Sequence, residues 1–128
     1  MKKILFVCVE NSCRSQMAEA FGHIHKSPDL AVYSAGSSPS GQVNPRAIEV
    51  MAERDYPLHN HRSEGLDKVQ ELEFDAVITM GGGDKCSGIS AHQRQDWPLP
   101  DPKYLPLEQF RQVRDEIETR VIDLIASL

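Results

Sequence analysis

A cysteine and an arginine flank a short loop near the start of the chain, and this spacing constrains the fold more than any other feature. The apolar run 4–7 is typical of a buried strand, and it stops at Cys8. Further on, Arg14 and Ser15 open the segment 15–26, which has the pattern of a helix. A strand, a tight loop and a helix in this order place the free N–H groups and the positive dipole end of the helix at the loop, where they favour an anion.

The side chains at the two ends of the loop suit the same ligand. Arg14 offers a planar fork of donors that fits a tetrahedral oxyanion in bidentate fashion. The positive field at the loop favours the thiolate form of Cys8, which is the nucleophilic form. We therefore interpret the loop as an oxyanion site with a thiolate aimed at the central atom. The residues expected to bind the oxyanion are Cys8, Val9, Glu10, Asn11, Ser12, Cys13 and Arg14.

Composition restricts the partners of this 128-residue chain. A net charge of −5 argues against nucleic acid, which would need a basic face. The length suits one domain, residues 1–128. Three cysteines, without metal-ligand spacing, favour nucleophilic or redox use over a disulfide framework. Because the chain enters a strand directly, with no signal peptide and no apolar run that could span a membrane, we expect a cytoplasmic monomer without a membrane partner.

Strands alternate with helices along the chain, which predicts a parallel sheet with right-handed crossovers. The fold class is therefore α/β: a single-domain three-layer sandwich in which helices flank a four-stranded parallel sheet. Active sites in such sheets lie at the carboxyl ends of the strands. We expect the ends of the first and third strands to be neighbours there. The expected strands are 4–7, 30–34, 74–80 and a short one formed by Trp97 and Leu99, and the expected helices are 15–26, one opened by Asn44 and Pro45, and one from Pro106 to the end.

The histidines carry no clear metal signal in the sequence. His59 and His61 are two residues apart, so they share a face if the segment is extended, but no third ligand is apparent. His23 and His25 are also two apart, on a predicted helix, where such residues do not face each other. We interpret His59 and His61 as surface residues and expect no bound metal at either pair.

The stretch from Asn11 to Glu19 after Cys8 resembles the low-molecular-weight protein tyrosine phosphatase superfamily, and within it the arsenate reductases. The phosphatases more often carry proline where Gln16 stands. Ser34-Ala35-Gly36 and the stretch that begins at Asn44 are also similar to the family, and the resemblance covers nearly the whole chain. Glu10 stands where many relatives have glycine, which indicates that this position does not need a positive φ.

The resemblance implies arsenate reduction by thiol chemistry. Cys8 would attack an arsenate held by the loop amides and Arg14. Asp101, followed by a proline as in the family, would protonate the departing oxygen, because an unprotonated oxyanion is a poor leaving group. A second thiol would then attack Cys8 and release arsenite, and the resulting disulfide would be reduced by a partner.

The second thiol is where this chain departs from the family. The resemblance implies two further cysteines after the third strand. Cys86 matches the later one, while the earlier position falls at Gly81 or Gly82. Two routes stay open: Cys86 attacks Cys8 and thioredoxin reduces the pair, or an external thiol such as glutathione, recycled by glutaredoxin, resolves the intermediate. Which reductant acts is left open by the sequence.

Several supporting roles also come from the resemblance. Ser15 would hydrogen-bond the Cys8 thiolate, Asn11 would brace the loop, and Cys13 would be structural. No bound cofactor is expected.

Some of the reductases hold a potassium ion beside the loop. The matching residues here are Asn11, Glu19 and Ser34, with others near 62–64. Because Arg62 stands where a threonine ligand is expected, its guanidinium would replace the ion.

Two rival functions remain. The same loop and acid would hydrolyse a phosphate monoester through a cysteinyl phosphate, although Tyr104 is the one aromatic residue near the site that could stack on a phosphotyrosine. A non-catalytic domain that binds arsenate, phosphate or sulfate is the third alternative. The joint presence of Cys8, Arg14, Ser15 and Asp101 argues against it.

Overall fold

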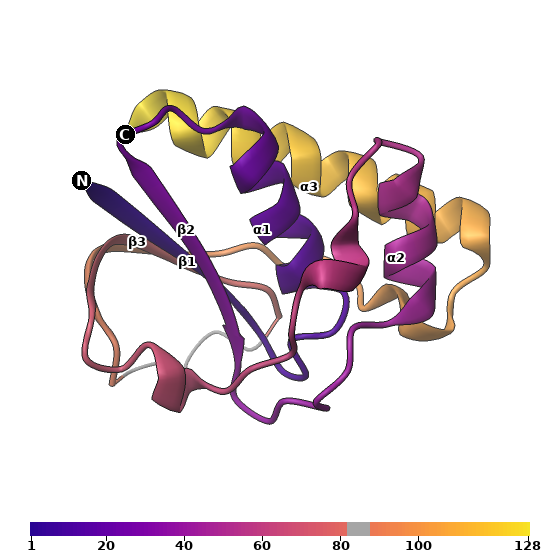
Figure 1. Ribbon diagram of the computed structural model, residues 1–128, viewed down its shortest axis with the longest axis horizontal. Coiled ribbons are helices and arrows are strands. Elements are labelled where there is room, and N and C mark those ends of the chain that lie inside the picture. The colour runs from indigo at the N-terminus through magenta and orange to yellow at the C-terminus, as the bar shows by residue number, and fades with distance from the viewer. Residues whose placement is uncertain (82–87) are drawn as a thin grey trace.

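A four-stranded parallel sheet forms the centre of the computed structural model, which describes residues 1–81 and 88–128 (Figure 1). The strand order is β2-β1-β3-β4, and every neighbouring pair is parallel. The predicted α/β class and the four-stranded parallel sheet are confirmed. The strands are β1 (Lys2–Cys8), β2 (Leu30–Gly36), β3 (Glu73–Thr79) and β4 (Ser90–Asp96).

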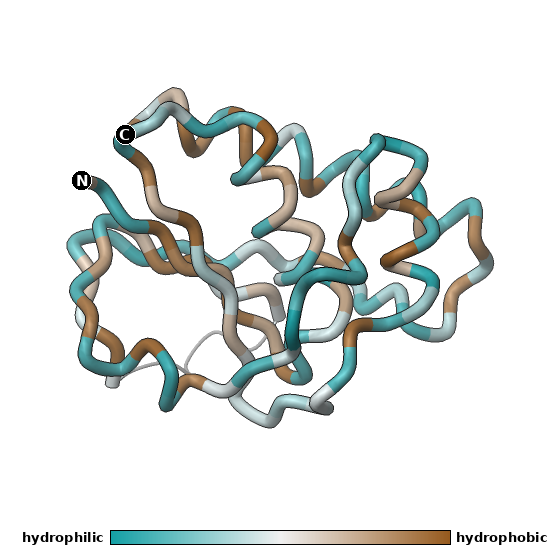
Figure 2. The backbone as a smooth tube through the Cα atoms, viewed as in Figure 1, coloured by the Kyte–Doolittle hydropathy of each residue, from teal (hydrophilic) through white to brown (hydrophobic). Residues whose placement is uncertain are grey.

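Helices cover one face of the sheet, where α1 (Arg14–His25) and the long α3 (Leu107–Ser127) lie side by side and α2 (Pro45–Ala52) packs against α3 (Figure 1). Figure 2 shows that hydrophobic residues follow the strands that these helices cover.

Among the described residues, no helix is long and apolar enough to cross a membrane.

Alternation along β1 divides the core in two. Ile4 and Phe6 pack on the helical side, while Leu5 and Val7 pack on the opposite side. The opposite side is covered by the segment around the short 3₁₀ helix η2 (Leu66–Lys68). Because successive strand residues point to opposite faces, a strand of consecutive apolar residues is buried on both.

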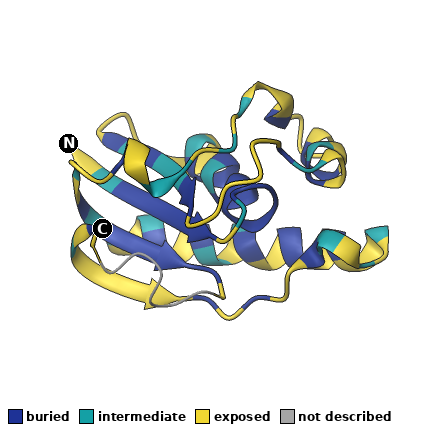
Figure 3. Cartoon of the chain, turned by 90° about the horizontal axis from the view of Figure 1, so that it is seen from below, coloured by how far each residue is buried: buried dark blue, intermediate teal, exposed yellow. Residues whose placement is uncertain are grey.

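The prediction of the fourth strand is wrong. β4 runs through Ser90–Asp96, a polar and mostly exposed segment, which is the yellow outer strand in Figure 3. Trp97 and Leu99 follow it and are buried, and the Trp97 ring lies 5.8 Å from that of Phe6. The side chains of this edge strand are mostly exposed, so its sequence has no hydrophobic alternation that would reveal a strand.

The helix starts agree with the positions predicted from the sequence. α1 and α3 begin within about one residue of the predicted positions, as expected for helix boundaries. Asn44 caps α2 as predicted: its side chain accepts a hydrogen bond from the Arg46 N–H, and Pro45 is the first helical residue.

Candidate active site

The loop between β1 and α1 is held in place by the side chain of Asn11. Asn11 is fully buried and has a left-handed backbone, with φ of 51°. Its Nδ2 donates to Ser15 Oγ at 2.7 Å, and its Oδ1 accepts from the Glu64 N–H at 2.8 Å and from Gln16 Nε2 at 3.0 Å. The left-handed position is therefore Asn11 and not Glu10, and the loop geometry depends on an amide that can both donate and accept.

The end of β2 also shapes the loop. A Cβ on Gly36 would lie 2.6 Å from the Val9 carbonyl oxygen, so only glycine permits this close approach.

Ser15 links the side chain of Asn11 to the thiol of Cys8. Cys8 Sγ lies 2.9 Å from Ser15 Oγ, and both side chains are buried. Because Ser15 Oγ already accepts a hydrogen bond from Asn11, its own proton is available to Cys8 Sγ. The chain Asn11–Ser15–Cys8 thus presents a hydrogen-bond donor to the sulfur.

Arg14 is buried at the first position of α1, and its guanidinium faces the segment that carries Leu99 and Asp101. Its Nη1 donates to the Leu99 carbonyl at 3.0 Å, and its Nη2 lies 3.8 Å from Asp101 Oδ2. Its Nε is buried and has no hydrogen-bond partner within residues 1–81 and 88–128. A buried charged donor without a partner is costly, and an oxyanion in the loop would satisfy it.

Asp101 lies at the N-terminus of the 3₁₀ helix η3 (Pro102–Tyr104), where Oδ1 accepts from the Lys103 N–H. Its side chain is about half exposed, and Lys103 extends to Glu10 in the loop, with Nζ 2.9 Å from each carboxylate oxygen. The Asp101 segment is thereby tied to the loop at a second point, besides Arg14.

Cys13 differs from Cys8 in its chemistry, although both thiols are buried. Burial raises the pKa of the Cys13 thiol to about 11. Cys13 is therefore a neutral thiol at physiological pH, which suits a structural residue.

The predicted proximity of the first and third strand ends is confirmed at Gly81. Gly81 has φ of 91°, and a Cβ there would lie 2.8 Å from Arg14 Nη1. Only glycine fits this approach to the guanidinium without a shift. Gly82 and Cys86 lie outside the described residues.

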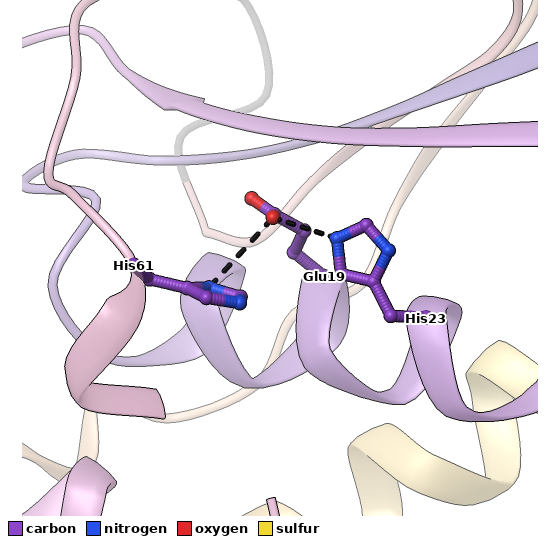
Figure 4. A group of neighbouring side chains, drawn as sticks. All are labelled: Glu19, His23 and His61. Carbon is purple, nitrogen blue, oxygen red and sulfur yellow. Dashed lines mark hydrogen bonds and ion pairs between the residues drawn. The ribbon is translucent and has the colours of Figure 1, made fainter. Parts of the chain in front are cut away.

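Beside the loop, three side chains that sequence analysis did not connect form a cluster, shown in Figure 4. Glu19 Oε2 lies 2.9 Å from His23 Nε2 and 3.7 Å from His61 Nδ1. Ser34 Oγ donates to the other carboxylate oxygen. Burial opposes ionisation of Glu19, but the hydrogen bonds from His23 and Ser34 outweigh it, so the pKa of Glu19 is lowered.

The prediction that His61 is a surface residue is wrong, whereas His59 is exposed as expected. Only a tenth of the His61 side chain is exposed. Its Nδ1 lies 2.9 Å from Gln16 Oε1 and its Nε2 lies 2.6 Å from the Tyr56 hydroxyl. Burial lowers the pKa of His61, so the ring is neutral near pH 7.

The prediction that the Arg62 guanidinium replaces a potassium ion is also wrong. Arg62 is exposed. It contacts the loop region through its backbone carbonyl, which accepts a hydrogen bond from Gln16 Nε2. The two histidines lie at the Glu19 carboxylate instead. Nitrogen donors suit softer ions than potassium, so these residues do not fit a potassium site.

Two other residues of the site were not predicted from the sequence. Gln16, quoted only as a family marker, donates to the backbone and side chain of Asn11. Lys103 had no signal at all, because its partner Glu10 is far away in the sequence.

Comparison with known proteins agrees with this geometry. The profile of the low molecular weight phosphotyrosine protein phosphatase family matches residues 3–128. The chain belongs to this family. An arsenate reductase of Staphylococcus xylosus is 40% identical over 123 residues, which are 94% of this chain and 93% of that protein. A glutaredoxin arsenate reductase of Synechocystis is 37% identical over 134 residues and covers all of this chain and 99% of its own length.

A solved structure of an arsenate reductase in the phosphate binding state superposes with a TM-score of 0.89. It is 37% identical and covers 99% of this chain and 98% of its own. The expected membership among the arsenate reductases of the family is thereby confirmed.

Proposed function

We propose that this chain reduces arsenate to arsenite with Cys8 as the nucleophile. The buried Arg14, whose Nε has no partner in the described part of the chain, carries the proposal. It supplies a fixed positive charge and a free donor beside a sulfur that lies within hydrogen-bond distance of the Ser15 hydroxyl. These features together suit a tetrahedral oxyanion attacked by a thiolate. The identity with arsenate reductases favours arsenate as that oxyanion.

In the first step, the loop N–H groups and Arg14 bind the arsenate oxygens. The Cys8 thiolate attacks arsenic, and an As–O bond breaks as Asp101, in its acid form, gives its proton to the departing oxygen, which leaves as water. The product is a covalent adduct between Cys8 and pentavalent arsenic. Asp101 lies next to Arg14 in the structure, so both act on the same bound anion.

In the second step, a thiolate attacks Cys8 Sγ and a disulfide forms. The electron pair of the sulfur–arsenic bond passes to arsenic, which leaves as trivalent arsenite. Two thiols are candidates for this step: Cys86, with thioredoxin as the reductant, or glutathione, with glutaredoxin as the recycling enzyme. The Synechocystis relative, named a glutaredoxin arsenate reductase, supports the second route, and the retention of Cys86 supports the first.

Stoichiometric arsenate, added to the reduced protein without another thiol, tests the proposal. Arsenite is quantified, and disulfides are mapped by mass spectrometry. One arsenite and a Cys8–Cys86 disulfide per chain establish the internal route. Cys86→Ser should abolish both, while Cys8→Ser should abolish the covalent arsenic adduct and arsenite release. If arsenite forms only after glutathione is added, glutathione resolves the adduct. If no arsenite forms under either condition and a phosphate ester is hydrolysed instead, the proposal is wrong and the chain is a phosphatase.

A further inference from the structure

The cluster of Glu19, His23 and His61 holds three metal-ligating atoms within 4.8 Å of one another (Figure 4). Glu19 and His23 are one helical turn apart on α1, a spacing that places both side chains on the same face. His61 comes from the segment after the 3₁₀ helix η1 (Leu58–Asn60), and its ring lies edge-on to that of His23, with the ring centroids 5.9 Å apart. The mechanism proposed above uses none of these side chains as a reacting group.

The distances suit a small tetrahedral ion. An ion that binds nitrogen and oxygen at about 2.0–2.1 Å has ligand atoms roughly 3.3 Å apart. Here Glu19 Oε2 lies 2.9 Å from His23 Nε2 and 3.7 Å from His61 Nδ1, on either side of that separation. Two imidazoles and one carboxylate also form the ligand set that zinc uses at sites with an open fourth position.

Each ligand has a neighbour that would orient it. Ser34 Oγ holds the other oxygen of Glu19, and the Tyr56 hydroxyl lies at His61 Nε2. When His61 carries its proton on Nε2, that N–H donates to Tyr56 and leaves Nδ1 free to bind the ion. Such outer partners fix the tautomer and direction of metal-binding histidines. About a third of the His23 side chain is exposed, which gives the ion a path from solvent.

We propose that Glu19, His23 and His61 form a binding site for a divalent ion of the zinc class. Binding takes His61 Nδ1 away from Gln16 Oε1, the atom it contacts in this structure. Gln16 also donates to Asn11, which braces the oxyanion loop. Metal binding is therefore coupled to the oxyanion loop through the side chain of Gln16. The metal ion itself takes no part in the reaction at Cys8.

Zinc titration of the reduced protein, followed by NMR of the histidine ring nitrogens, tests the site. The ring signals of His23 and His61 should shift together and saturate at one zinc per chain, while those of the exposed His59 stay in place. His23→Gln should weaken binding at least about tenfold, since even outer-shell partners contribute 10–100-fold to metal affinity. His25→Gln is the matched control on the same helix, and it should bind as the parent does.

Zinc could instead bind a cysteine thiol. The NMR signals of the histidine rings distinguish a thiol site from the proposed histidine site. If zinc protects Cys8 from alkylation while the His23 and His61 signals do not move, the ion binds the thiol alone and the proposal is wrong. If His23→Gln and His25→Gln bind equally well, the cluster is not the site. His23 is half-buried on the surface of α1, so its variant is expected to fold even where a change at His61 would not.

Discussion

The ammonium group of Lys103 lies 2.9 Å from each carboxylate oxygen of Glu10, and this contact joins the oxyanion loop to the segment that carries Asp101. Hydrogen bonds to Glu10 raise the pKa of Lys103. About a third of each side chain is exposed, and ion pairs in contact with solvent contribute little to stability. Its effect is therefore expected on the position of Asp101 and not on folding.

Lys103→Met should lower kcat with arsenate several-fold and leave the melting temperature unchanged, because Asp101 loses one of its two tethers. Glu10→Gln should have the same effect, and the double variant should be no worse than either single one, since both changes remove a single contact. Steady-state kinetics and thermal unfolding measure the two effects. Additive losses in the double variant would show that the residues act independently.

Asn11 allows a comparison that separates backbone strain from hydrogen bonding. Asn11→Ala should destabilise the fold by about 2–4 kcal/mol, because buried partners at Ser15, Gln16 and Glu64 lose hydrogen bonds. Asn11→Gly loses the same bonds but adopts φ of 51° freely, so it should be about 1–2 kcal/mol more stable than the alanine variant. Urea unfolding measures both. Equal stabilities would mean that the left-handed backbone is not strained here.

The substitution Gly81→Ala tests the close approach to Arg14. A Cβ at this position would lie 2.8 Å from Nη1, and φ of 91° disfavours any residue with a side chain. We expect arsenate and phosphate to bind at least several-fold more weakly, because the guanidinium must move away from Leu99. Competition with phosphate measures the affinity. Ser38→Ala, an exposed change after β2, is the control and should bind normally.

The sequence predicted the parts of the site that depend on local order. Cys8, Arg14 and Ser15 follow from a strand, a loop and a helix that are contiguous, so the fold brings them together in the expected way. The environment of His61 could not be predicted, because its burial depends on Gln16 and Tyr56, which meet it only in the folded chain.

The edge strand β4 could not be predicted from periodicity for a similar reason. It is held by backbone hydrogen bonds to β3, and these leave no trace in its polar side chains. Hydrophobic pattern predicts what a segment buries, and this strand buries little.

The raised pKa of Cys13 predicts selective alkylation. At pH 8, about three units below a pKa of about 11, roughly one Cys13 thiol in a thousand is ionised. Iodoacetamide should therefore modify Cys8 well before Cys13, as resolved by peptide mass spectrometry over time. Under denaturing conditions the burial is lost and the two rates should become similar. Equal rates in the folded protein would contradict the assignment of Cys13 as a neutral buried thiol.

A buried arginine between α2 and α3 predicts how stability depends on pH. Arg114 donates to the Val50 carbonyl, Glu53 and Asp115. Hydrogen bonds from Arg111 and Arg114 lower the pKa of Glu53. Burial opposes ionisation of Asp115, but its bond to Arg114 outweighs this and lowers the pKa of Asp115 as well.

Because both carboxylates have lower pKa values folded than unfolded, their stabilising effect is complete above about pH 5 and is lost as the pH falls below about 4. Arg114→Met should be less stable than the parent at pH 7, and the difference should shrink by pH 3, where the carboxylates are increasingly protonated in both proteins. Free energies of unfolding in urea across this range measure the effect. Arg62→Met, which changes an exposed arginine, should follow the parent curve. A constant difference between Arg114→Met and the parent at every pH would mean that Arg114 stabilises the fold through Val50 and packing alone.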